Sequence, residues 1–161
     1  MIFDVPLIAQ GSDETCWYAA ARMIIEYYRQ QKRQSTIRGG SIGMPEMNKR
    51  VFSNNQPINS ASVAQFASTY GFSTRYICPS PAGLRSILNE CGPLWYGGHW
   101  TGKNAGHVVV ITGCAVKGIT ESTVYLNDPL PVGVGTKTYQ EFSSLFHNLE
   151  QMIDVPFLYM R

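Results

Sequence analysis

The sequence predicts an α+β protein with helices in its N-terminal half packed on an antiparallel sheet formed by its C-terminal half. Helical spacing of apolar residues dominates as far as Gly92, whereas β-branched and aromatic runs bounded by Gly, Pro and Asn dominate after it. The chain has 161 residues, of which 44% are hydrophobic and 12% aromatic, enough for the core of one domain. Since no repeat or linker divides it, we expect a single domain over residues 1–161.

The N-terminal half contains three segments with helical periodicity. Asn59 caps the second segment and Gly71 ends it, while Ser80 followed by proline opens the third and Gly92 ends it. We therefore predict helices over residues 16–31, 59–70 and 80–91. Between the first two, residues 33–57 are polar and rich in glycine, which indicates a surface excursion.

The C-terminal half contains four runs with the composition of strands. They cover residues 93–96, 107–114, 121–127 and 155–160. One further helix is predicted over residues 139–149, because Thr138 followed three residues later by Glu141 has the pattern of a capping box.

The charge and the start of the chain exclude several classes of partner. Charged residues make up 15% of the chain and the net charge is +2, too little and too scattered for a nucleic-acid surface. No apolar run approaches the roughly 18 residues of a membrane span, and residues 1–6 lack the basic and apolar regions of a secretory signal peptide. We expect no nucleic-acid or membrane partner.

The cysteines and histidines do not have the spacing of a metal site. The four cysteines, at positions 16, 78, 91 and 114, form no C-x-x-C pair, and the histidines at 99, 107 and 147 are dispersed. A core of this size needs no disulfide framework, so we expect free thiols. Neither a metal nor a cofactor is expected.

Cys16 begins the first predicted helix, directly after Thr15. Unpaired N–H groups and the helix dipole favour an anion at this position and lower the pKa of a thiol, as a nucleophile requires. Gln10, in the preceding loop, is close enough to aim its side-chain amide at an oxyanion formed beside Cys16. The alternative is that Cys16 is a small buried apolar residue, as cysteines commonly are.

The spacing Gln10-x5-Cys16-Trp17 resembles the papain-like cysteine proteases. The resemblance implies a papain-like fold in which Gln10 and the backbone N–H of Cys16 form the oxyanion hole. It also implies that Trp17 packs beneath the site as a structural residue.

The family order predicts a histidine base far downstream, at the start of a strand. His107 begins such a run directly after Gly106. One alternative is that His107 is a core histidine with satisfied hydrogen bonds. His99, in a Gly-rich loop, is the rival base, whereas His147 lies on a helix and is expected to be solvated or packed.

The third member of the triad is expected on the neighbouring strand. Asp128, in Asn127-Asp128-Pro129, ends that strand and can accept the N–H of His107. Papain has asparagine at this position, so the sequence is more similar to bacterial branches with Asp-Pro. Asn127 is the fallback, and the alternative for the whole tripeptide is a simple turn.

Together with Gly92-Pro93-Leu94-Trp95, these motifs most resemble the papain-like avirulence-effector proteases of plant-associated bacteria. They are also similar to the peptidase domains that process double-glycine bacteriocin leaders. The resemblance implies a bacterial endopeptidase with a protein or peptide substrate, delivered as an effector or toxin domain by a specialised secretion system into a target-cell cytoplasm. A cognate immunity protein is a further partner that it suggests.

Two other functions fit the same residues. The Cys-His-Asp set could serve an amidase, a deamidase or a transglutaminase, because all of these share thioester chemistry. The chain could also be an inactive papain-like domain that binds a peptide without cutting it. The intact Cys16, His107 and Asp128 favour an enzyme over a binding domain.

Overall fold

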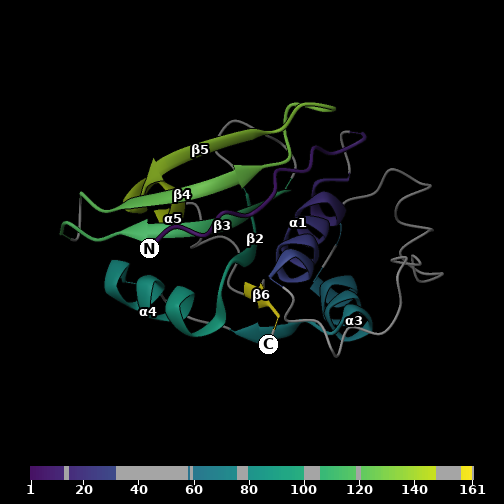
Figure 1. Cartoon of the computed structure of the whole chain (residues 1–161), viewed down its shortest axis with the longest axis horizontal. Coiled ribbons are helices and arrows are strands. Elements are labelled where there is room, and N and C mark those ends of the chain that lie inside the picture. The colour runs from purple at the N-terminus through teal and green to yellow at the C-terminus, as the bar shows by residue number, and fades with distance from the viewer. Residues whose placement is uncertain are drawn as a thin grey trace.

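Helices lie on both faces of one antiparallel sheet in the computed structural model (Figure 1). The structure describes residues 1–12, 15–31, 58, 60–75, 80–99, 106–118, 121–147 and 157–160. The strands are β1 (Ser73–Arg75), β2 (Leu94–His99), β3 (Gly106–Ala115), β4 (Thr123–Asp128), β5 (Thr136–Glu141) and β6 (Phe157–Tyr159). Their order in the sheet is β1-β6-β2-β3-β4-β5. The predicted α+β class, with N-terminal helices on an antiparallel sheet, is confirmed.

The helices of the described part begin and end close to the positions that the sequence predicts. They are α1 (Cys16–Gln30), α3 (Ser60–Tyr70), α4 (Pro81–Cys91) and α5 (Phe142–His147). The Ser80 hydroxyl caps α4 by accepting the N–H of Gly83 at 3.0 Å. Gly71 and Gly92 follow their helices with φ of 72° and 79°. The predicted cap at Asn59 and the excursion over residues 33–57 lie outside the described residues.

Strand β3 forms the centre of the core because both of its faces are buried. Val108 and Val110 pack with α1 and α3, whereas Val109 and Ile111 pack with α4 and α5. A strand covered on both faces needs apolar residues at every position, which explains the unbroken apolar run. The strand that carries the candidate base His107 is therefore firmly packed.

The N-terminal segment lies alongside β3. Phe3 N–H donates to the Thr112 carbonyl at 2.8 Å, and Ile2 bridges to Gly113. The approach is close, because a Cβ on Gly113 would come within 2.8 Å of the Met1 carbonyl oxygen. This contact fixes the course of the chain towards the loop that precedes α1.

Two strands were absent from the sequence prediction. The region starting at Tyr139, predicted as helix, instead completes β5, and α5 begins only at Phe142. The capping-box interpretation of Thr138 and Glu141 is wrong, because both residues pair with β4. Strand β5 is a polar edge strand without apolar alternation, so periodicity could not reveal it. The short strand β1 was missed as well.

We expect Gly92→Ala to lower the free energy of unfolding by about 2 kcal/mol or more. Gly92 has φ 79° and ψ −157°, a region that L side chains avoid, and a Cβ there would overlap the Tyr28 hydroxyl. Urea unfolding followed by circular dichroism measures the effect. Gly118→Ala is the control, because a Cβ there meets nothing within 4 Å. Equal stability of the two variants would contradict this interpretation.

Candidate active site

Cys16 is the first residue of α1, and its side chain is buried, with 6% of its surface exposed. Hydrogen bonds between Ser12 and Thr15 stabilise the chain before Cys16. The Thr15 hydroxyl donates to the Ser12 carbonyl at 3.0 Å and accepts the Ser12 N–H at 3.2 Å. Trp17 lies in the core, where its ring meets that of Phe66 edge to face. The thiol is thus at a helix start, where backbone N–H groups and the helix dipole favour an anion.

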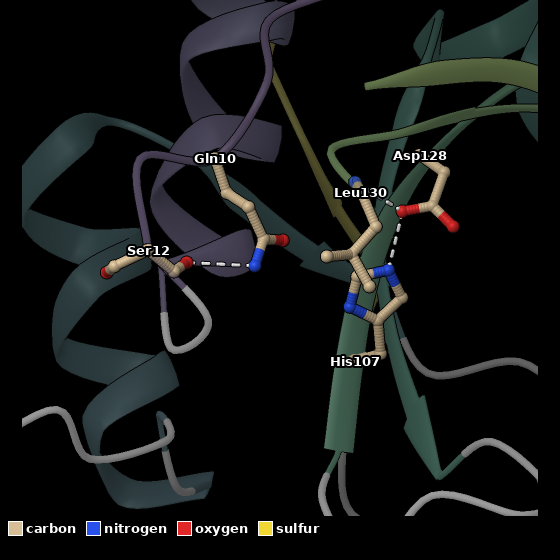
Figure 2. A network of polar contacts seen from close by, with 5 residues as sticks. All are labelled: Gln10, Ser12, His107, Asp128 and Leu130. Carbon is tan, nitrogen blue, oxygen red and sulfur yellow. Dashed lines mark hydrogen bonds and ion pairs between the residues drawn. The ribbon is translucent and has the colours of Figure 1, made fainter. Parts of the chain in front are cut away.

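His107 is the second residue of β3 and pairs with Gly98 of β2. Its side chain is buried, and its Nε2 lies 2.6 Å from Oδ1 of Asp128. An ionised carboxylate only accepts hydrogen bonds, so Nε2 carries the hydrogen and donates it. Figure 2 shows the other ring nitrogen, Nδ1, on the side of the ring that faces Gln10. The imidazole is therefore oriented by Asp128 through one nitrogen, with the second directed towards the Gln10 loop.

Asp128 ends β4 and is held by more than one contact. Its Oδ1 accepts the N–H of Leu130 at 2.8 Å in addition to the bond from His107 (Figure 2). Its backbone pairs with Thr136 of β5. Because both the strand and the following turn restrain it, the carboxylate has little freedom to leave the imidazole.

Asn127, the fallback for the third position, has a different role. Its side-chain amide donates to the Val5 carbonyl at 2.9 Å, and only 2% of the residue is exposed. This bond ties the N-terminal segment to β4. The contact to His107 comes from Asp128, as the sequence predicts for that residue.

Gln10 lies in the loop before α1 and is 1% exposed. Its N–H donates to the Pro129 carbonyl at 3.0 Å, and its carbonyl accepts the N–H of Gly133 at 2.9 Å. These two backbone bonds join the loop to the turn that follows Asp128. The side-chain Nε2 donates to the Ser12 carbonyl at 2.8 Å (Figure 2). A glutamine amide has two N–H groups, so this bond alone does not exhaust its donors.

The start of α1 is held against the strands that lead to the histidine. Cys16 belongs to the same core cluster as Val108 and Val110 of β3. The Trp95 indole N–H of β2 donates to the Trp17 carbonyl at 3.0 Å, deep in the core. Helix start, central strand and Gln10 loop thus converge on one region, and the structure brings together the elements that carry the four predicted residues.

The remaining histidines occupy the ends of other elements. His99 is the last residue of β2, where it pairs with Gly106, and His147 is the last residue of α5. The hydrogen bond that the structure gives between Asp128 and a histidine is the one to His107.

Cys91 and Cys114 are buried in a different core cluster from the one that contains Cys16. Cys91 and Cys114 are free thiols, as expected, and burial raises the pKa of the Cys114 thiol. Cys78 and Trp100 lie outside the described residues. Within the described ranges, no group of three or more His, Cys, Asp or Glu side chains could hold a metal ion. None of the helices described here combines the length and apolar character of a membrane span.

Sequence reasoning missed two backbone groups that position the site. The N–H of Leu130 supports Asp128, and the N–H of Gly133 supports Gln10. The only available signal was the Pro- and Gly-rich composition of residues 129–135, which predicts a turn but not its partners.

Comparison with known proteins adds to this geometry. The family described as papain-like cysteine protease AvrRpt2 matches residues 1–147, a range that includes all four candidate residues. No curated protein and no solved structure matches the chain. The family match confirms the resemblance to avirulence-effector proteases that the motifs predict. The chain therefore belongs to the papain-like cysteine protease AvrRpt2 family.

Proposed function

We propose that this protein is an endopeptidase that hydrolyses peptide bonds of a polypeptide substrate, with Cys16 as nucleophile and His107 as acid and base. The observation that carries the proposal is the 2.6 Å hydrogen bond between His107 Nε2 and Asp128 Oδ1. A histidine oriented by a carboxylate is the arrangement that activates a nucleophile, because it fixes which nitrogen exchanges the proton. Membership of a cysteine protease family supports the same reaction.

The first half of the reaction is acylation of the enzyme. The Cys16 thiolate attacks the substrate carbonyl carbon, and the carbonyl oxygen becomes an oxyanion that Gln10 Nε2 and the Cys16 N–H stabilise. The intermediate collapses when the C–N bond breaks and the His107 imidazolium gives its proton to the leaving amine. A thioester on Cys16 remains.

The second half releases the acid. A water molecule attacks the thioester as His107 takes its proton, and a second oxyanion forms at the same donors. Collapse breaks the C–S bond, releases the carboxylic acid product and returns the thiolate and the imidazolium. Asp128 acts throughout as a positioning residue that keeps the imidazole in one orientation.

Within this proposal the chain acts as a bacterial effector or toxin domain that cuts a protein in a target cell. The support is its membership of the papain-like cysteine protease AvrRpt2 family. A cognate immunity protein would be a natural partner of such a domain, since a producing cell needs protection from an active protease.

We expect Cys16→Ala to abolish cleavage of a proteome-derived peptide library, read by mass spectrometry with reductant present. Without the thiol no thioester can form, while the small buried side chain is replaced by one that still fits the core. Cys114→Ala is the matched control, since Cys114 is another buried free cysteine, and it should retain the cleavage pattern.

Four outcomes of that experiment, combined with iodoacetamide labelling of the thiols, separate the functions. Cuts that vanish only in Cys16→Ala support the endopeptidase. Cuts that persist in Cys16→Ala contradict it. If the wild-type chain makes no cuts but Cys16 labels faster with iodoacetamide than the other thiols, the result favours amidase or transglutaminase chemistry over the endopeptidase. If the wild-type chain makes no cuts and Cys16 is not selectively labelled, the result favours a peptide-binding domain.

We expect Gln10→Ala to lower kcat by about 10²-fold, the usual cost of losing one oxyanion donor. Alkylation of Cys16 by iodoacetamide passes through no oxyanion, so its rate should stay close to that of the wild-type chain. Peptide cleavage kinetics and mass-spectrometric labelling measure the two rates. If both rates fall equally, Gln10 supports the loop through its bond to Ser12 rather than the oxyanion.

A further inference from the structure

The turn formed by residues 129–135 is bonded to both sides of the proposed site. It follows directly from Asp128, and two backbone bonds join it to Gln10, through the Pro129 carbonyl at 3.0 Å and the Gly133 N–H at 2.9 Å. The position of this turn relative to the imidazole and to the oxyanion donor is therefore fixed by the same contacts that build the site.

The turn is also closed by bonds of its own. The Pro131 carbonyl accepts the N–H of Val134 at 3.0 Å and that of Gly135 at 2.9 Å. Gly135 has φ 68° and packs closely on Leu7, because a Cβ there would come within 3.2 Å of that side chain. The side chains of the turn are thus presented from a well-bonded backbone.

Three aliphatic side chains project from this turn, and we name them the apolar rim: Leu130, Val132 and Val134. Val132 is 41% exposed and Val134 is 69% exposed. Leu130 is half-buried, and Figure 2 shows its side chain extending towards the His107 ring. Single exposed apolar residues are ordinary, but a group of them on an ordered turn beside a site indicates recognition.

The proposed reaction sets the direction of the substrate over this turn. The carbonyl oxygen faces Gln10, and the leaving nitrogen faces His107, which must protonate it. The polypeptide beyond that nitrogen therefore leaves the centre on the side of Asp128, where the apolar rim begins.

We infer that the apolar rim is a specificity subsite, and that it binds an aliphatic or aromatic side chain of one of the first two substrate residues on the amine side of the cut. This inference rests on the proposed function. Residues 129–135 include no charged side chain, so an acidic or basic substrate residue would lose hydration there without gaining an ion pair. An apolar residue would instead cover exposed valine surface.

The test uses a peptide that the wild-type chain cleaves, remade with Leu, Phe, Ser, Asp or Lys at each of the two positions after the cut. We expect the wild-type chain to prefer Leu or Phe over Asp by about tenfold in kcat/KM at one of them. The double variant Val132→Lys/Val134→Lys should lose this preference and cleave the Asp peptide faster than the wild-type chain does.

Two further variants make the result specific. Val132→Thr/Val134→Thr keeps the shape of both side chains and should lower the preference for Leu without creating one for Asp. Because this variant is nearly isosteric with the wild-type chain, it keeps the test valid even if the lysine variant misfolds. Tyr139→Lys is the control, because Tyr139 is 70% exposed on β5 but outside the turn, and it should leave the profile unchanged.

The outcomes distinguish failure of the specificity subsite from failure of the endopeptidase itself. Cleavage by the wild-type chain without any preference for apolar residues, or the same preference in both double variants, overturns the subsite and leaves the endopeptidase standing. No cleavage of any peptide by the wild-type chain overturns the endopeptidase and the subsite together.

Discussion

The pair of backbone hydrogen bonds between Gln10 and the turn of residues 129–135 is the contact on which the site depends. It joins the loop before α1 to the end of β4, two segments that are far apart in the sequence. Since Cys16 begins α1 shortly after Gln10, the bonds that hold the loop also limit where the thiol can lie relative to the sheet. Two further hydrogen bonds attach the N-terminal segment to the sheet. Asn127 of β4 donates to the Val5 carbonyl, and the Phe3 N–H donates to the Thr112 carbonyl of β3.

The proposed chemistry depends on a rigid strand and on a carboxylate oxygen that accepts two hydrogen bonds. His107 is the second residue of β3, a strand buried on both faces, so its backbone cannot shift without disturbing the core. Asp128 Oδ1 accepts from His107 and from the Leu130 N–H, so a single oxygen links the imidazole to the turn. The same turn then contacts Gln10 through Gly133. The proposed acid and base His107, the proposed oxyanion donor Gln10 and the apolar rim are therefore parts of one connected backbone arrangement. Such preorganisation is what the proposed catalysis requires.

Features with a local cause could be predicted from the sequence. Helix α4 has a serine cap, an N-terminal proline and a glycine stop, each of which acts within a few residues. The strand over residues 107–114 was predicted from its run of β-branched residues next to glycine, a composition that burial on both faces favours. The positions of Gln10, Cys16, His107 and Asp128 followed from the family motifs. β5 could not be predicted because it is polar and is stabilised by its pairing with β4 rather than by an apolar pattern of its own. The hydrogen bond from the Gly133 N–H to the Gln10 carbonyl could not be predicted either. Nearly every residue type carries the same backbone N–H and carbonyl groups, so the sequence does not indicate their partners.

The central claim is that Asp128 holds His107 so that the imidazole can pair with the Cys16 thiolate. The most direct test is the rate of Cys16 alkylation by iodoacetamide as a function of pH, measured by mass spectrometry in the wild-type chain and in Asp128→Ala. The account predicts that the wild-type rate stays near its maximum well below pH of about 8.5, where an ordinary thiol titrates, and that Asp128→Ala moves the profile towards that value. An ordinary thiol profile in the wild-type chain, unchanged by Asp128→Ala, would contradict it.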